Sequence, residues 1–276
     1  MLLFLAFVFG LIAGSFLNVV IYRLRNDLPI SGRSFCPECK TILKWYDLIP
    51  ILSFIFLKGC CRYCHKKISW QYPIVEVLSG FIWVGIFYKI YGRTNLLEQT
   101  YAVQSLQFLN LNLLNFFYYI LIFSAFLIIT VCDFKWKIIP DKIIYPAIAA
   151  VLIFNLFNAF KFLNFEIFIY PFFAAAIAFL FFFAIYFFSS GRAMGLGDAK
   201  LAFLIGLFLN PLLATVAFVS AFIIGAAFGI ILIGLGGVFP SYRKWGMKSQ
   251  IAFGPFLVLG AFLAFFFSDF IISITS

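Results

Sequence analysis

Residues 189–201 read Ser189-Ser-Gly-Arg-Ala-Met-Gly-Leu-Gly-Asp-Ala-Lys-Leu201 and separate two long apolar runs. Asp198 stands at the start of the second run, where burying a charge at membrane depth is costly. An ionisable group in such a place is by default a candidate functional residue. Gly195 and Gly197 lack a Cβ, so we expect them to let the backbone turn tightly and approach whatever Asp198 acts on. The stretch therefore predicts a working carboxylate at the end of a membrane span.

A second acid, Asp133, follows another apolar run, in Cys132-Asp-Phe-Lys-Trp-Lys-Ile-Ile-Pro-Asp141. Two carboxylates brought together share one proton, because like charges resist double ionisation. Such a pair can hydrolyse a peptide: the ionised acid takes a proton from water, and the protonated acid stabilises the oxyanion. Asp141 is a third candidate, but an Asp before an apolar run is a good N-cap, and we expect it to cap the next helix. Lys200 would either adjust the acidity of Asp198 or contact lipid headgroups.

The composition is that of a polytopic membrane protein. Of 276 residues, 65% are hydrophobic and 11% charged, and 42 are phenylalanine, more than a soluble domain could bury. The net charge of +10 would suit nucleic-acid binding, but the basic residues concentrate in loops on one side, as membrane topology requires. Residues 1–22 form an apolar run without a basic n-region or a cleavage site, so we expect a first span rather than a signal peptide.

Apolar runs of about 20 residues, enough for a span, predict about eight transmembrane helices. The sixth is short, because Asn210-Pro211 ends it. The expected spans are residues 2–22, 72–91, 108–131, 143–160, 167–188, 199–209, 212–235 and 251–274. The expected fold is all-α, divided into a first helix (1–22), a cytoplasmic loop stapled by zinc (23–70) and a helical bundle that carries both acids (71–276).

The basic residues assign the sides of the membrane. Eight spans place residues 23–70, 134–142, 189–200 and 237–250 on one side, and these segments hold 17 of the 20 Lys and Arg residues. The positive-inside rule makes that side the cytoplasm and puts both termini outside. Asp133 and Asp198 then lie at the same cytoplasmic edge, which favours the hypothesis that they act as a pair.

The loop 23–70 carries two Cys-x-x-Cys pairs. Their spacing predicts a tetrahedral, structural zinc site with four thiolate ligands, Cys36, Cys39, Cys61 and Cys64. A disulfide is the weaker alternative, because the loop is expected in the reducing cytoplasm. Cys60 adjoins the second pair and competes as a ligand, whereas His65 is expected to be a bystander. A closed site of four cysteines leaves no open position for catalysis and would instead hold together a loop too short for its own core.

Polar residues also mark the first two spans. Gly10, Gly14 and Asn18 recur every fourth residue and give the first span a small, polar face suited to helix packing; Asn18 would also be placed to contact substrate. Glu76, near the start of the second span, has two interpretations. Its side chain reaches the headgroup region, or it is a polar contact for a bound cofactor.

Taken together, the sequence resembles the prepilin peptidase family, the leader peptidases and N-methyltransferases of type IV pilus and type II secretion systems. The likeness covers nearly the whole chain. It rests on residues 14–23 (Gly-Ser-Phe-Leu-Asn-Val-Val-Ile-Tyr-Arg), both cysteine pairs, residues 45–53 and 68–80, the segment from Asp133 to Pro140-Asp141, and Gly195-Leu-Gly-Asp-Ala-Lys200. The Gly-x-Gly-Asp motif alone is shared with presenilin-like proteases and would be less specific.

The resemblance implies a bifunctional enzyme of the bacterial inner membrane with its active site facing the cytoplasm. Asp133 and Asp198 would cut the basic leader from a prepilin or pseudopilin, and S-adenosylmethionine would then supply a methyl group to the new N-terminus. Supporting residues around the catalytic pair would be Gly195, Gly197, Lys200, Pro140 and Asp141. Candidates for the methyltransferase are Glu76, Tyr72 and Gly80. The expected partners are the pilin substrate and the bilayer, with no nucleic acid. Cys60 departs from the family pattern and leaves one zinc ligand open.

Three other functions compete with this one. In an ion- or proton-coupled transporter the two acids would be carrier sites, although transporters place such acids near the midplane and often carry inverted repeats, and no repeat is visible here. A membrane scaffold held together by zinc would tolerate the loss of Asp198. A leader peptidase without methyltransferase activity would cut the leader and leave the new N-terminus unmodified.

Overall fold

The computed structural model describes residues 1–92, 104–192, 194–238 and 252–275 of the chain. These residues form helices and loops, and the only extended pairing among them is two isolated bridges in the cysteine loop. The predicted all-α class is therefore confirmed. The chain divides into two compact units, residues 1–128 and 129–276, and the boundary falls within the long helix α4 (Gln104–Trp136).

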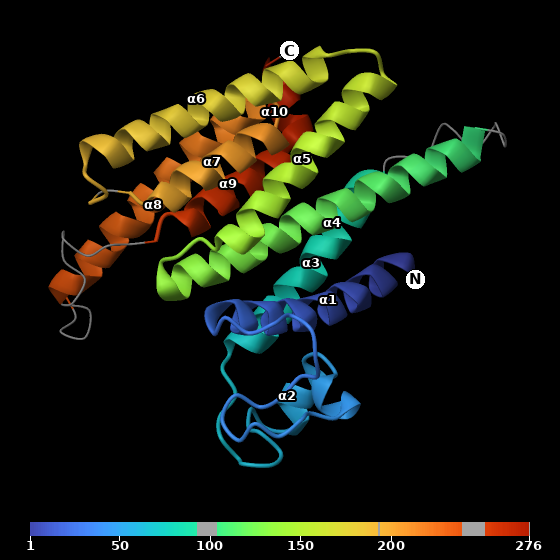
Figure 1. Cartoon of the computed structure of the whole chain (residues 1–276), viewed down its shortest axis with the longest axis vertical. Coiled ribbons are helices and arrows are strands. Elements are labelled where there is room, and N and C mark those ends of the chain that lie inside the picture. The colour runs from blue at the N-terminus through green and yellow to red at the C-terminus, as the bar shows by residue number, and fades with distance from the viewer. Residues whose placement is uncertain (93–103, 193, 239–251, 276) are drawn as a thin grey trace. The chain divides into compact units, whose positions relative to one another are not determined.

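In the first unit, α1 (Leu2–Arg25) and α3 (Gln71–Tyr91) pack closely along their length (Figure 1). The glycines predicted to line this contact do so. A Cβ added to Gly10 would lie 2.7 Å from the Cα of Gly80, and one added to Gly14 would lie 2.7 Å from the Cα of Glu76. Any side chain at these positions would push the helices apart, so the small face of α1 fixes how closely they pack.

The loop between α1 and α3 contains a short 3-10 helix, η1 (Trp45–Leu48), and one short α-helix, α2 (Leu52–Phe56). Arg23, at the end of α1, holds the start of the loop, since its buried guanidinium donates to the carbonyls of residues 29–33. Glu76 of α3 holds the middle, because it accepts the N–H of Ile51 at 2.8 Å. Glu76 is 6% exposed, so the interpretation of its side chain as reaching the headgroups is wrong: the loop covers it.

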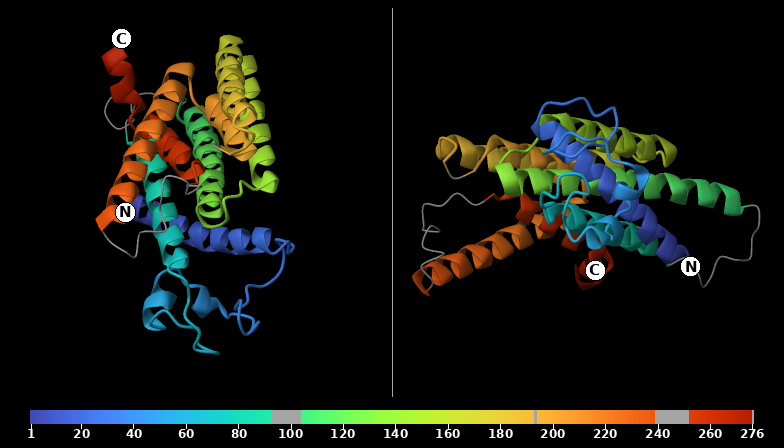
Figure 2. Two further views of the ribbon diagram at one scale, coloured as in Figure 1. Left: turned by 90° about the vertical axis from the view of Figure 1, so that its left-hand side faces the viewer. Right: turned by 90° about the horizontal axis from the view of Figure 1, so that it is seen from below.

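The second unit contains the end of α4 together with α5 (Asp141–Lys161), α6 (Glu166–Phe188), α7 (Leu196–Phe208), α8 (Pro211–Val238), α9 (Gly254–Phe266) and α10 (Ser268–Thr275). The short α7 is largely enclosed, with Leu201, Leu204 and Ile205 fully buried. It contacts α5, α6, α8 and α9, and Figure 2 shows it beside α5 and α6. A Cβ on Gly206 would lie 2.6 Å from the Cα of Ala175 in α6, so close packing places α7 and its first turn.

The predicted count of eight spans is not confirmed. Six helices in the described part are long and apolar enough to cross a membrane, or seven if the bent pair α9 and α10 counts as one span. α7 has 13 residues, about 20 Å of helix against a hydrocarbon core of about 30 Å. The expected span 251–274 is not one straight helix: α9 and α10 meet at 70° around Phe267 and form either one bent span or a re-entrant loop; residue 251 lies outside the described residues. The break at Asn210-Pro211 is confirmed, since α7 ends at Phe208 and α8 begins at Pro211.

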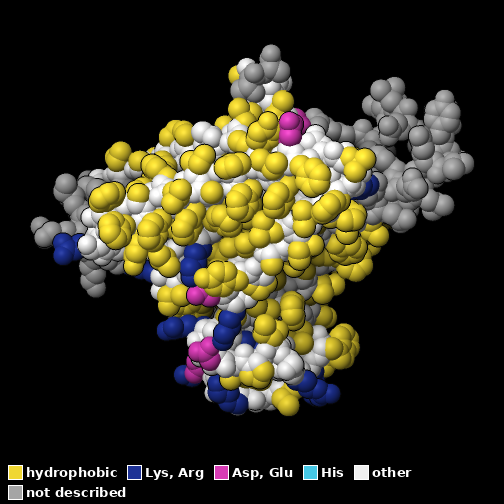
Figure 3. Space-filling view, turned by 45° about the horizontal axis from the view of Figure 1, so that its top comes forward, with side chains coloured by type: hydrophobic (Ala, Val, Ile, Leu, Met, Phe, Trp, Pro, Cys, Tyr) yellow, Lys and Arg dark blue, Asp and Glu magenta, His cyan; other side chains and the backbone are white. Residues whose placement is uncertain are grey.

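The surface of the helices is hydrophobic, as a bilayer requires. Figure 3 shows a face on which hydrophobic side chains form a broad continuous area. Phe173, Ile177, Leu180 and Phe181 of α6 are each more than half exposed. Residues of this kind would be costly to leave in water, so the fold is that of a multi-pass membrane protein.

Candidate active site and metal site

Asp133 lies in the last turn of α4 and is 6% exposed. The helix continues to Trp136, beyond the predicted span end at residue 131, and so the acid belongs to the helix rather than to the loop after it. Its Oδ2 accepts a hydrogen bond of 2.9 Å from the backbone N–H of Gly254, the first residue of α9. The carboxylate is therefore buried at the N-terminus of a helix, where negative charge is favoured.

Asp198 is the third residue of α7 and is 8% exposed. Its Oδ2 accepts the N–H of Gly195 at 3.1 Å, as an acid at the third position of a helix does in a capping box. The turn at these glycines does not use the left-handed conformation that glycine favours: Gly195 has φ −82°, and Gly197 has no positive φ either. Gly197 instead makes room for Ile139, whose Cβ would lie 3.0 Å from an added Cβ.

The two acids lie within electrostatic range of each other in the second unit. Burial, and then the negative charge of Asp133, raise the pKa of Asp198 to about 7. Asp198 lies outside the candidate membrane spans, because α7 is not one of them. A carboxyl with a pKa near 7 beside a second buried carboxyl can share one proton with it at neutral pH, which is the arrangement that acid–base hydrolysis by two carboxyls needs.

Lys200 and Asp141 form an ion pair beside Asp198. The Nζ of Lys200 lies 2.6 Å from Oδ1 of Asp141 and 5.0 Å from the centroid of the Tyr145 ring. Lys200 thus binds α5 rather than lipid headgroups. The predicted N-cap role of Asp141 is wrong by one position, because Pro140 is the N-cap and Asp141 is the first residue of α5. Its carboxylate is therefore free to face Lys200.

The four predicted cysteine ligands come together. The Sγ atoms of Cys36, Cys39, Cys61 and Cys64 all lie within 4.8 Å of one another, and Cys60 is outside this group. Four convergent thiols match the donor set of a closed tetrahedral site with metal–sulfur distances of about 2.3 Å. The residues present therefore fit a structural metal ion.

The two cysteine pairs repeat one backbone conformation. In the first, the N–H of Cys36 donates to Thr41 and Lys40 has φ +58°; in the second, the N–H of Cys61 donates to Lys66 and His65 has φ +56°. Each loop is closed by an antiparallel bridge, Phe35 to Ile42 and Cys60 to Lys67. His65 therefore occupies the left-handed position that ends the turn. It is not among the ligand group, and Cys60 is the counterpart of Phe35.

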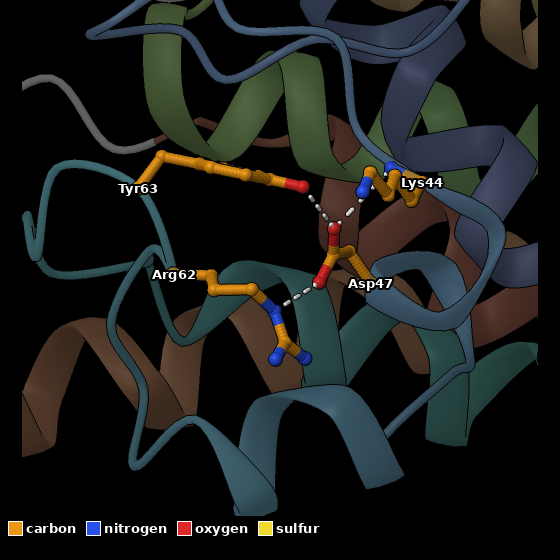
Figure 4. A network of polar contacts seen from close by, with 4 residues as sticks. All are labelled: Lys44, Asp47, Arg62 and Tyr63. Atoms are coloured by element: carbon orange, nitrogen blue, oxygen red, sulfur yellow. Dashed lines mark hydrogen bonds and ion pairs between the residues drawn. The ribbon is translucent and has the colours of Figure 1, made fainter.

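Asp47 joins η1 to the second cysteine pair (Figure 4). Its side chain is 3% exposed, and it accepts hydrogen bonds from Arg62 Nε at 2.8 Å, Tyr63 Oη at 3.0 Å and the backbone N–H of Lys44 at 3.2 Å. Burial alone would raise the pKa of Asp47, but these hydrogen bonds, Arg62 first, outweigh burial and lower it. Arg62 and Tyr63 are the two residues between Cys61 and Cys64, so Asp47 fixes the turn that aims both thiols.

The residues predicted to serve methyl transfer all lie on α3. The carbonyl of Tyr72 accepts a hydrogen bond of 3.1 Å from Asn18. A Cβ on Gly80 would lie 2.7 Å from the ring of Phe7, and Glu76 holds Ile51 as described above. These contacts are internal to the fold, and the assignment of the three residues to the methyl donor stays a prediction.

Sequence reasoning missed the contact between Gly254 and Asp133. The only local signal was Gly254-Pro255 ahead of an apolar run, which marks the first turn of a helix. That pattern does not predict which side chain contacts the N-terminus of the helix. The buried anchor of Asp47 was missed for the same reason, because its partners follow in a separate part of the loop.

The fold and these sites define a multi-pass helical membrane protein with paired buried acids and a cluster of four cysteines that could hold a metal ion. Residues 8–90 match the family described as Bacterial Peptidase A24 N-terminal domain, and residues 120–230 match the Type IV leader peptidase family. The chain belongs to the type IV leader peptidase family.

Three relatives show how far the likeness extends. A Vibrio cholerae protein is 36% identical over 227 residues, covering 78% of this chain and 81% of its own. A Bacillus subtilis protein is 29% identical over 277 residues (99% and 97%), and a Pectobacterium carotovorum protein is 28% identical over 290 residues (92% and 88%). Each is a prepilin leader peptidase/N-methyltransferase. No solved structure matches the chain.

Proposed function

We propose that this protein cleaves the leader peptide from a prepilin or pseudopilin and methylates the new N-terminus. The observation that carries the peptidase half is the pair of buried carboxyls, Asp133 and Asp198, within electrostatic range in one unit. The name shared by the relatives in three bacteria supports both halves. It gives no support to a transporter.

In the proposed mechanism the two acids hold one proton between them. Asp198 carries it, because its pKa is raised to about 7 by burial and by the charge of Asp133. Asp133 takes a proton from water as the water attacks the scissile carbonyl, and Asp198 donates its proton to the developing oxyanion. As the intermediate collapses, Asp133 passes its proton to the leaving amine and Asp198 takes one back from the hydroxyl that becomes the product carbonyl. Acid–base catalysis of this kind contributes about 10²–10⁴-fold in rate.

The four cysteines are proposed to bind Zn²⁺ as a structural ion. When bound, zinc ties both cysteine turns to one point and supplies no open position for water. The residues that hold it are Cys36, Cys39, Cys61 and Cys64, and Asp47 aims the second pair. The ion would stabilise a loop that has little apolar core of its own.

Methylation is proposed to use S-adenosylmethionine, which supplies the methyl group. Glu76, Tyr72 and Gly80 remain the candidates for its site, and their contacts to Ile51, Asn18 and Phe7 are made within the first unit. These contacts do not form a cradle for the donor.

The proposed setting is the bacterial inner membrane, with both acids at the cytoplasmic edge. The basic segment 134–142 directly follows Asp133 and the basic segment 189–200 contains Asp198, and the positive-inside rule places such segments in the cytoplasm. A basic leader would reach the site from the same side.

The experiment that tests the proposal uses the full chain in proteoliposomes. The substrate is a peptide with a basic leader, a glycine and an apolar helix, supplied with S-adenosylmethionine and followed by mass spectrometry. We expect wild type to remove the leader and add a methyl group, and Asp133→Asn and Asp198→Asn to lose cleavage. Asp269→Asn, an exposed acid in the first turn of α10, is the matched control and should cleave normally.

The two halves of the proposal separate in the same assay. A pre-cleaved peptide tests methylation alone, and both aspartate variants should methylate it at the wild-type rate. Leader removal without a methyl on the product would leave a peptidase only. Cleavage that persists in both aspartate variants would contradict the mechanism.

A further inference from the structure

We propose that Gly254 is a positioning residue of the peptidase site: its N–H holds the carboxylate of Asp133, and its missing Cβ leaves the space that the carboxylate occupies. The proposal rests on the assignment of Asp133 to the proposed peptidase. It adds the first turn of α9 to a site otherwise built from α4 and α7.

The first support is the hydrogen bond. The N–H of Gly254 donates to Oδ2 of Asp133 at 2.9 Å in a buried setting. Gly254 is the first residue of α9, so this N–H has no partner within its own helix. The Asp133 carboxylate takes the place of a capping side chain, and no side chain of α9 caps the helix. The contact therefore satisfies the donor and fixes one oxygen of the acid.

The second support is the space. A Cβ built on Gly254 would lie 2.5 Å from Oδ2, 3.2 Å from Cγ and 3.5 Å from Cβ of Asp133, and these are its three nearest atoms. Any L side chain at position 254 would thus displace the carboxylate itself. Gly195, which holds Asp198, is different, because a Cβ there would lie 3.6 Å from Asp198 Oδ2, an ordinary contact.

The two acids are consequently held in different ways. Asp198 is fixed by its own helix turn, through a residue three positions earlier. Asp133 is fixed across 121 positions of sequence by a separate helix. The placement of α9 therefore decides where the Asp133 carboxylate lies. A shift of about 1 Å in a reacting group costs on the order of 10²-fold in rate.

The kinetic test compares Gly254→Ala with Gly229→Ala in full-length protein. Nothing lies within 4 Å of a Cβ added at Gly229, so this variant controls for the substitution alone. We expect Gly254→Ala to lower kcat for leader cleavage about 10²-fold with KM within about twofold of wild type. Methylation of a pre-cleaved peptide by the same preparation should stay at the wild-type rate, which shows that the chain is folded.

A stability cycle separates positioning from general packing. In the Asp133→Ala background the clashing Oδ2 and Cγ are gone, and so Gly254→Ala should cause no loss of unfolding temperature there. Gly260→Ala on the same helix meets the Ala217 carbonyl instead. Its loss of unfolding temperature should be equal in both backgrounds, because independent sites are additive.

Two results would overturn the inference while the proposed peptidase stands. One is Gly254→Ala cleaving within about threefold of wild type while Asp133→Asn is inactive. The other is a loss of unfolding temperature from Gly254→Ala that is unchanged in the Asp133→Ala background. If instead both aspartate variants cleave like wild type, the proposed peptidase mechanism fails, and the role of Gly254 fails with it.

Discussion

Lys200 reaches from α7 to Asp141 at the first residue of α5, with 2.6 Å between Nζ and Oδ1. Lys200 follows Asp198 by two positions, so the ion pair ties the turn that carries Asp198 to a second helix. Its ammonium also lies over the Tyr145 ring. The ion pair therefore links α7 to α5 two residues from Asp198 and involves neither of the two buried acids.

Substitution of Asp141 is therefore expected to weaken the enzyme without inactivating it. Asp141 is 60% exposed, and exposed ion pairs contribute about 0–1 kcal/mol. We expect Asp141→Asn to lower kcat less than about tenfold, and Asp141→Asn/Lys200→Met to be no worse than either change alone. Initial rates of leader cleavage measure this. An Asp141→Asn protein as inactive as Asp198→Asn would show that Asp141 takes part in the reaction.

The rate of cleavage should fall on the alkaline side of neutrality. In the proposed mechanism the two acids share one proton, and burial with the charge of Asp133 raises the pKa of Asp198 to about 7. As the pH rises through about 7 the proton leaves, so kcat should fall about tenfold per pH unit beyond it. Methylation of a pre-cleaved peptide should instead rise toward pH 8, because the α-amino group must lose its proton at about 7.7–8.0. A cleavage rate that stays flat to pH 9 would contradict the shared proton.

Metal content should depend on four of the six cysteines. We expect Cys39→Ser and Cys64→Ser to lose most of the bound zinc, because both thiols belong to the convergent group. Cys60→Ser and Cys132→Ser are the matched controls and should keep wild-type metal, since neither Sγ is in that group. The zinc content of each variant is measured with a chromogenic chelator after denaturation releases the metal. Loss of metal from Cys60→Ser would show that Cys60 is a metal ligand.

Asp47 should control how firmly the metal is held. Asp47→Asn removes a buried carboxylate that binds Arg62 and Tyr63 between two ligands. Changes in groups that orient metal ligands cost about 10–100-fold in affinity, and we expect a weakening of that size in competition with a chelator. Glu38→Gln is the control: Glu38 lies between the other two cysteines, but its side chain is 60% exposed and 3.8 Å from Lys66. Equal weakening by both changes would contradict the role of Asp47.

Much of the helical frame could be predicted because long apolar runs have one stable form in a membrane. Expected spans such as 72–91 and 143–160 differ from α3 and α5 by one or two residues at most ends. The convergence of the four cysteines was equally predictable, since the spacing of the two pairs is typical of a tetrahedral site. Asp133 and Asp198 were found because carboxylates are rare and costly beside such runs.

Other features depended on contacts that no local pattern reveals. The break at Phe267 between α9 and α10 has neither proline nor glycine at the bend. Glu76 could be recognised as unusual, but its burial depends on the N–H of Ile51 in a distant loop. Gly254 faces Asp133 only after α9 has packed in the second unit. The two cysteine pairs also share one backbone turn, although residues 35–42 and 60–67 are identical only at their two cysteine positions.

The guanidinium of Arg23 also limits which substitutions the first unit tolerates. It donates from two nitrogens to five carbonyls, those of residues 29–33. A lysine ammonium has three donor hydrogens on one nitrogen, so it could not donate to all five of these carbonyl oxygens or span the same arc. Lysine would keep the positive charge but not the planar arrangement of donors. We therefore expect that, in a library of variants at position 23, only arginine gives a folded protein.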